Sequence, residues 1–131
     1  MSISLSLPWP PSNNAMYRQF RGRAILSAAG RDYRHAVALT VIEAGSPKVD
    51  AYPVAVWLEA CPPDRRKRDC DNIPKGVLDA LVTAEVLASD DNRHIAFLGV
   101  SWGAGVPDGE VRVFIEQWSS SKAFYPQIRV P

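Results

Sequence analysis

The apolar residues of this chain follow two different periods, and the order in which these periods alternate constrains the fold more than any other feature of the sequence. Apolar and polar residues that alternate one by one predict a half-buried strand, whereas apolar residues three to four positions apart predict a helix with one buried face. The chain shows strand patterns over residues 2–7, 51–60, 95–103 and 110–118, and helical patterns over residues 28–44 and 76–87.

The resulting order, β-α-β-α-β-β, indicates an α+β fold in which a small mixed β-sheet carries two helices packed on one face. A chain of 131 residues fits a single domain, residues 1–131. Ser27 precedes the first helix as an N-cap, and Pro74 fits the first turn of the second. Residues 16–26 have no clear period and are interpreted as an ordered loop or a hairpin arm, and residues 118–131 as a polar and aromatic tail.

The sequence also argues against several classes of protein. No apolar run approaches the roughly 20 residues of a membrane span. The start of the chain, MSISLSLPWP, lacks the basic residues and long apolar core of a signal peptide, so we expect a cytoplasmic protein with no membrane contact. The two cysteines are too few for a disulfide framework and too far from each other and from the histidines for a zinc site; Cys61 is expected to be a small buried residue.

The segment DRRKRDCDNIPK, residues 64–75, places five cations and three carboxylates in twelve positions. The formal net charge of the whole chain is only +1. The charge is nevertheless unevenly distributed, because residues 18–75 hold eleven Lys or Arg against seven Asp or Glu, and residues 76–131 hold four against seven. A polyanion is therefore expected to bind one face of the protein.

Asp69 and Asp71 are two residues apart, so in an extended chain both carboxylates point to one face while Cys70 points into the protein. Two convergent carboxylates favour a cation between them. Mg²⁺ is the usual choice, because it takes oxygen ligands at about 2.1 Å and keeps several waters and a phosphate oxygen. A third carboxylate is available from Asp90 or Asp91, if the chain turns back after the second helix.

Cations beside such a metal would bind the phosphodiester backbone of a nucleic acid. Hydrolysis of the phosphodiester also requires the metal, which polarises the phosphoryl oxygens. The basic run expected to bind the backbone consists of Arg65, Arg66, Lys67 and Arg68. Lys75 lies one helical turn after Asp71 and is placed to orient the nucleophile or to stabilise charge in the transition state. The mixed signs therefore indicate a metal-dependent nuclease.

Each of these residues also has a purely structural interpretation. Asp69 and Asp71 fit surface ion pairs with the basic run. Asp71 or Asn72 fits the cap of the following helix, and Lys75 fits the ion-pair partner of Asp71 at i+4. Asp79, one turn beyond Lys75 on the same helix face, fits a structural partner of that lysine.

With these residues assembled, the chain resembles the RusA family of Holliday-junction resolvases, small endodeoxyribonucleases often carried by phages and prophages. The resemblance covers most of residues 3–95 in order: LPWPPSNN, the helix around SAAGRDYR, PDRRKRDCDNIPKGVLDAL and SDDN. PDRRKRDCDN, followed by Lys75 and LDAL, is its most specific part, together with LPWPPSNN. The chain departs from the family pattern at Cys70, where an aliphatic residue is usual, and in one extra residue between LDAL and SDD.

The resemblance implies a homodimer that binds four-way DNA junctions and nicks two opposing strands symmetrically, in DNA recombination and repair. It implies Mg²⁺ as cofactor, with Mn²⁺ as the alternative. The family's essential metal-binding acids match Asp69, Asp71 and Asp91, with Asp91 favoured over Asp90 as the third, and its lysine matches Lys75. The basic run and Lys75 would contact DNA. A four-way junction has approximate two-fold symmetry, so paired nicks need two sites related by that symmetry.

Two other functions are compatible with the residues alone. A non-catalytic module that binds nucleic acid or a phage-encoded partner would use its acids as ion pairs and caps, and would bind a junction without nicking it. A small globular domain with no nucleic-acid role would have no affinity for a junction. Tyr17, Phe20 and Tyr33 are interpreted as core or loop-packing aromatics rather than as stacking partners for bases.

Overall fold

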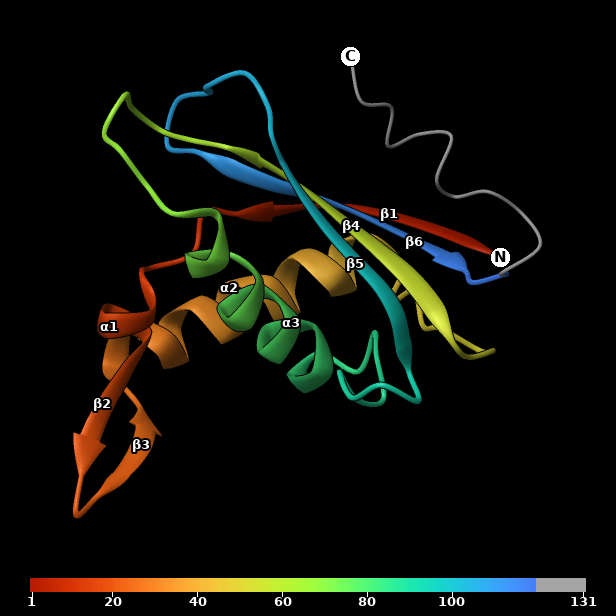
Figure 1. Cartoon of the computed structure of the whole chain (residues 1–131), viewed down its shortest axis with the longest axis horizontal. Coiled ribbons are helices and arrows are strands. Elements are labelled where there is room, and N and C mark those ends of the chain that lie inside the picture. The colour runs from red at the N-terminus through yellow and green to blue at the C-terminus, as the bar shows by residue number, and fades with distance from the viewer. Residues whose placement is uncertain (120–131) are drawn as a thin grey trace.

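Four strands form one mixed β-sheet in the order β1-β6-β4-β5 in the computed structural model, which describes residues 1–119 (Figure 1). The strands are β1 (Ser2–Pro8), β4 (Val54–Cys61), β5 (Ile95–Trp102) and β6 (Glu110–Gln117). β6 pairs antiparallel with both β1 and β4, whereas β4 and β5 are parallel. Of the predicted tail, residues 120–131 lie outside the described residues.

Two helices, α2 (Ala28–Glu43) and α3 (Pro74–Thr83), lie together on one face of this sheet (Figure 1). Their apolar sides are buried with the inward-facing residues of the strands; these helix residues include Tyr33, Val37, Val41, Val77 and Leu81. Removing this apolar surface from water is the main force that holds helices and sheet together. The predicted α+β class, with a mixed sheet and two helices on one face, is confirmed.

The two main helices begin in different ways. α2 begins as predicted, because the hydroxyl of Ser27 accepts a hydrogen bond from the N–H of Gly30 at 3.0 Å. α3 has Ile73 at its N-cap position and no side-chain cap, although Pro74 occupies its first turn as expected. The prediction that Asp71 or Asn72 caps this helix is therefore wrong.

α3 also ends four residues earlier than its apolar pattern predicts. Glu85 has φ of 63°, in the left-handed region, so the chain leaves the helical path there. Val86 and Leu87 remain buried, although they lie in the following loop. The apolar period continues because these residues still face the core, and period alone does not distinguish the last helical turn from a packed loop.

Three small elements lie near the starts of α2 and α3. α1 (Asn13–Met16) leads into a two-stranded hairpin of β2 (Tyr17–Phe20) and β3 (Arg23–Leu26), which projects from the body (Figure 1). Of the two alternatives for residues 16–26, the hairpin arm is the one observed. The third small element is η1 (Cys70–Asn72), a single 3₁₀ turn before α3.

The three aromatic residues interpreted as packing residues divide into two groups. Tyr33 is buried, and Tyr17 is half-buried at the base of the hairpin. Phe20 is 49% exposed near the hairpin tip, so its interpretation as a packing aromatic is wrong.

Within the described part of the chain, the helices are all too short or too polar to cross a membrane.

Candidate active site

Asp69 and Asp71 lie at the surface, where the chain passes from an extended segment into η1. Asp69 is still extended, with φ of −89° and ψ of 135°, whereas Cys70 and Asp71 belong to the 3₁₀ turn. Side chains in such a turn rotate by about 120° per residue, so the alternation expected of a strand does not apply here. Cys70 is exposed, and the expectation that it points into the protein is wrong. Both aspartates are exposed as well.

The segment that follows β1 packs beside Asp69. The side-chain oxygen of Asn72 accepts a hydrogen bond from the backbone N–H of Asn13 at 3.0 Å. The guanidinium group of Arg68 lies 5.4 Å from the centre of the Trp9 ring. Together the two segments line a hollow of about 550 Å³ that includes Asp69. The motifs LPWPPSNN and PDRRKRDCDN, far apart in the sequence, therefore form one surface.

Asp64 organises the basic run. Its carboxylate lies 2.9 Å from Nη1 of Arg68 and 3.1 Å from Nη2 of Arg66. Hydrogen bonds from Arg68 and then Arg66 hold the pKa of Asp64 well below its ordinary value, so this carboxylate stays ionised into strongly acidic solution. Sequence reasoning missed this role, although an acid directly before a run of four cations was an available signal.

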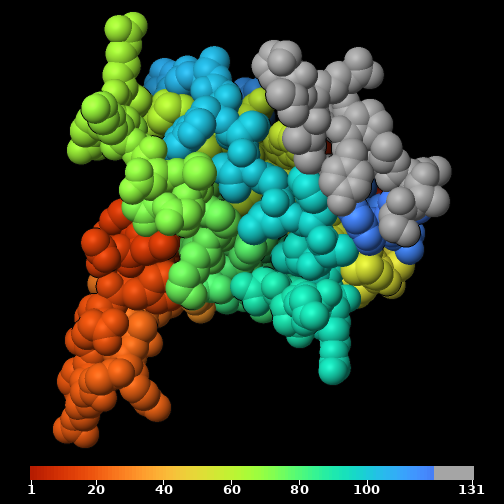
Figure 2. All heavy atoms as spheres, viewed as in Figure 1, coloured from red at the N-terminus to blue at the C-terminus, as the bar shows by residue number. Residues whose placement is uncertain are grey.

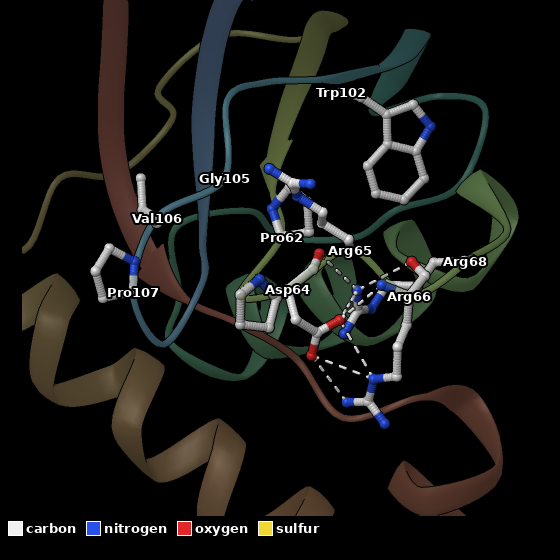
Figure 3. Close-up of a pocket in the computed structure, with 10 residues that line it drawn as sticks. Pro62, Asp64, Arg65, Arg66, Arg68, Trp102, Gly105, Val106 and Pro107 are labelled. Atoms are coloured by element: carbon white, nitrogen blue, oxygen red, sulfur yellow. Dashed lines mark hydrogen bonds and ion pairs between the residues drawn. The ribbon is translucent and has the colours of Figure 1, made fainter.

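The other two members of the basic run, Arg65 and Lys67, are exposed and form no ion pair within residues 1–119. Arg65 lines a broad hollow of about 770 Å³ together with Arg66, Arg68 and Trp102, and Figure 3 shows these side chains around it. Trp102 ends β5 and is 46% exposed. The hollow thus offers cations and an aromatic face to a ligand.

Lys75 lies in the first turn of α3 within a cluster of polar groups. Its Nζ lies 3.5 Å from Oδ2 of Asp79 and 4.9 Å from the centre of the Tyr17 ring. Tyr17 donates a hydrogen bond to the same carboxylate, and Nη2 of Arg34 lies 3.8 Å from it. Burial and, next, the bond to Asp79 raise the pKa of Tyr17 to about 12. The interpretation of Asp79 as a structural partner of Lys75 is confirmed.

Asp91 lies just before β5 and contacts His94. Its Oδ1 is 2.6 Å from Nδ1 of His94 and accepts a hydrogen bond from the backbone N–H of Arg93 at 3.0 Å. The contact with His94 lowers the pKa of Asp91. The neighbouring Asp90 is exposed.

In one chain, Asp91 and the pair of Asp69 and Asp71 lie at opposite ends of the parallel strands β4 and β5. β4 and β5 are parallel, and Asp91 precedes the start of β5 while Asp69 follows the end of β4. A strand of eight residues, the length of β4, is on the order of 25 Å long. Consistent with this separation, residues 1–119 contain no group of three His, Cys, Asp or Glu side chains arranged to hold a metal ion.

Asp69 and Asp71 by themselves supply a donor set that suits Mg²⁺. This ion is usually held by one or two carboxylates and completes its octahedron with waters and substrate phosphate oxygens. Both carboxylates are exposed and adjoin the basic run, so a phosphate drawn to the cations would lie beside them. These features define a candidate site for a metal-dependent nuclease.

Comparison with known proteins identifies the family. Residues 8–116 match the family of endodeoxyribonuclease RusA. The chain is 48% identical over 83 residues to the crossover junction endodeoxyribonuclease RusA of Escherichia coli strain K12, an alignment that covers 63% of this chain and 69% of the relative. It is 47% identical over 81 residues to the corresponding protein of Enterobacteria phage 82, covering 61% and 67%. The chain belongs to the RusA family of endodeoxyribonucleases. Nucleases of this family are generally metal-dependent.

Proposed function

We propose that this chain is a Mg²⁺-dependent endodeoxyribonuclease that resolves four-way DNA junctions by nicking two opposing strands symmetrically. The observation that supports the proposal is the surface that LPWPPSNN and PDRRKRDCDN form together, where Asp69 lies beside cations of the basic run, in a chain of this family. Asp71 follows Asp69 by two residues and is exposed as well. Two of the relatives to which the chain is similar are named crossover junction endodeoxyribonucleases. Action on recombining DNA makes the cytoplasm the expected location.

Asp69 and Asp71 would hold the metal in this proposal. A bound Mg²⁺ supplies a Lewis acid for a phosphoryl oxygen and lowers the pKa of coordinated water. Arg65 and Lys67 would bind phosphates on either side of the cut, since their charges are not neutralised by a nearby acid in the described residues. Lys75 would stabilise negative charge in the transition state; its ammonium group is held by Asp79 and the Tyr17 ring.

We also propose a homodimer, because Asp91 is far from the other two acids within one chain. A two-fold axis can bring the end of the sheet where β5 begins, with Asp91 of one protomer, to the candidate site of its partner. The three acids matched by the family pattern would then meet across the interface. Two such sites related by the axis would account for paired nicks in a symmetric junction.

The direct test is a nicking assay on a synthetic four-way junction with labelled strands, with and without Mg²⁺. The wild-type chain should produce paired nicks only with the metal. Asp71→Asn should lower the nicking rate by at least about a thousandfold, since it removes a metal ligand while keeping the size of the side chain. Binding of the junction, measured without Mg²⁺, should be unchanged or tighter because one negative charge near the phosphates is lost.

Asp50→Asn is the matched control, because Asp50 is exposed in the segment before β4 and lies outside the proposed site. It should nick at the wild-type rate. Normal nicking by Asp71→Asn would refute the metal-binding role. Junction binding by the wild-type chain without nicks in any divalent metal would favour the non-catalytic module instead.

A further inference from the structure

The β2–β3 hairpin is the part of the described chain that the fold itself explains least. Residues 18–24 are all exposed, and Figure 2 shows the hairpin, in orange, projecting from the same side of the molecule as the segment that carries the basic run. An isolated two-stranded hairpin is only marginally stable in water, so it gains little from packing on the body beyond its base. A projecting hairpin of this kind contributes little to the stability of the fold and is available to contact a ligand.

The hairpin is strongly cationic. From Asn13 to Arg31 the chain holds four arginines and no acidic residue. Three of these arginines, Arg18, Arg21 and Arg23, surround the tip, and none of them forms an ion pair within residues 1–119. Unneutralised arginines on a projecting arm fit a polyanion, because each phosphate contact releases bound counterions.

Phe20 is the one large apolar side chain at this cationic tip. It is 49% exposed, and the guanidinium groups of Arg18 and Arg21 lie 5.6 Å and 5.3 Å from the centre of its ring. Cation–π contacts at exposed sites are weak, so both arginines can move to phosphates and free the ring. Proteins that bind single-stranded nucleic acid commonly stack an aromatic ring on an unpaired base and bind the neighbouring phosphates with cations.

The backbone at the tip is specialised as well. Arg21 and Gly22 form the two-residue turn with φ of 52° and 75°, so both residues are left-handed. Turns of this type favour Asn-Gly or Asp-Gly, whereas this chain has an arginine at the first position. Arg21 thus adds a third cation at the apex of the hairpin, at a turn position that favours Asn or Asp.

The base of the hairpin is fixed to the candidate active site. Tyr17, the first residue of β2, donates a hydrogen bond to Asp79 of α3, and its ring contacts Lys75. Four strand residues reach about 13 Å from this point, which corresponds to roughly four nucleotides of a DNA strand. DNA that extends about four nucleotides from the candidate site along the hairpin would reach its tip.

We propose that the β2–β3 hairpin recognises the branch point of the DNA, with Phe20 stacking on a base unpaired at the crossover while Arg18, Arg21 and Arg23 bind the adjoining phosphates. This inference rests on the proposed function, because it assigns the contact that distinguishes a junction from a duplex at that same site. Stacking needs an unstacked base, which a continuous duplex does not offer. Phe20 therefore contributes to branch selectivity, and the three arginines contribute to affinity for any DNA.

The test measures binding of a four-way junction and of a duplex with identical arms, without Mg²⁺, for the wild-type chain and for Phe20→Leu. Loss of the stacked ring should weaken junction binding at least about fivefold and leave duplex binding unchanged. Phe20→Trp should retain junction binding. Phe114→Leu is the matched control, since Phe114 lies on β6 and is 41% exposed; it should bind both DNAs as the wild type does.

A junction with 2-aminopurine at the crossover reports the stacking directly. Its fluorescence should change on binding of the wild-type chain and should change much less with Phe20→Leu. The triple variant Arg18→Gln, Arg21→Gln, Arg23→Gln should weaken junction and duplex binding alike and lower the salt dependence of binding by about three phosphate contacts. Lys48→Gln, an exposed cation far from the hairpin in the chain, should leave the salt dependence unchanged.

Three results would overturn the inference. One is that Phe20→Leu binds and cuts junctions normally; another is that it weakens duplex binding equally. The third is that Phe20→Leu changes the oligomeric mass of the protein, which would make the hairpin a contact between copies of this chain. Each of these leaves the proposed function standing, provided that the wild-type chain still nicks the junction with Mg²⁺. A wild-type chain that never nicks it overturns the proposed function itself.

Discussion

At the scale of single residues, the basic run divides into two kinds of cation. Asp64 pairs with Arg66 and Arg68, and this arrangement leaves Arg65 and Lys67 unpaired within the described residues. The paired arginines shape the surface, because Arg68 also covers the ring of Trp9. Arg65 and Lys67 therefore carry positive charge that no acid within the described residues neutralises, and we expect these two residues to bind phosphate.

The double variant Arg65→Gln, Lys67→Gln should therefore lose two phosphate contacts. Its logarithmic salt slope for DNA binding should fall by about two, and its affinity should weaken most at low salt. Titrations at several salt concentrations measure both quantities. Lys48→Gln again serves as a control of matched charge, and an unchanged slope in the double variant would exclude these two residues from the DNA contact.

Asp79 is the residue on which Lys75, Tyr17 and Arg34 converge. Asp79→Asn should destabilise the fold by about 1–3 kcal/mol, because it weakens hydrogen bonds to charged and partly buried groups. The pKa of Tyr17 should fall from about 12 but stay above its ordinary value, because burial is the larger cause of the shift. Urea unfolding and ultraviolet absorbance of the tyrosinate form measure the two effects.

Asp32→Asn is the control for this change, since Asp32 is an exposed acid on α2. It should alter the free energy of unfolding by no more than about 0.5 kcal/mol. If Asp79→Asn were equally neutral, the polar cluster around Lys75 would not hold that lysine in place.

At the scale of elements, α2 is tied to α1 and the hairpin through a close approach at Gly30. A Cβ at this position would lie 2.4 Å from the backbone oxygen of Met16 and 2.6 Å from Cδ1 of Leu26. The Met16 oxygen is itself held by the N–H of Ser27 at 2.9 Å, so it has little freedom to move away. The small residue lets the start of α2 pack directly against the base of the hairpin.

Gly30→Ala is accordingly expected to destabilise the fold by about 1–3 kcal/mol through overpacking. Helix propensity alone predicts the opposite sign, a gain of about 1 kcal/mol in a helix interior. Thermal or urea unfolding of the variant therefore distinguishes the two effects by sign. A stabilised Gly30→Ala variant would show that the helix start and the hairpin base can separate at little cost.

At the scale of the whole molecule, the separation of Asp91 from the other acids predicts a particular behaviour of mixed dimers. Asp71→Asn and Asp91→Asn chains should each be inactive alone. A heterodimer of the two has one intact site, in which Asp71 of one chain meets the partner's Asp91. Mixing equal amounts of the two inactive chains should therefore restore about a quarter of the wild-type number of active sites.

The control mixes Asp71→Asn with Asp69→Asn, whose altered residues lie on the same segment of one chain. Their heterodimers have no intact site under either arrangement, so no nicking should return. Recovery in the first mixture alone supports a shared site. Absence of recovery in both would mean that the three acids do not meet across the dimer interface.

Local information was sufficient for the regular elements. Alternation marked β1 and β4, the apolar runs on either side of a turn marked β5 and β6, and the helical period and Ser27 located α2 almost to the residue. These features depend on neighbours within one or two turns, which the sequence contains. Where a residue packs against distant segments, local patterns were insufficient: the hairpin alternative for residues 16–26 stayed open, and α3 ended at Thr83, four residues earlier than predicted.

The sequence by itself determined the fold class, the family and the chemical character of the site, because period, composition and motif are properties of the chain in order. Only the tertiary structure decided where those groups point. It turned Cys70 outward, paired Asp64 with the arginines, exposed Phe20 and placed Asp91 at the opposite end of the strands from Asp69 and Asp71. The physical reason is that each of these depends on how strands and helices pack across long sequence separations.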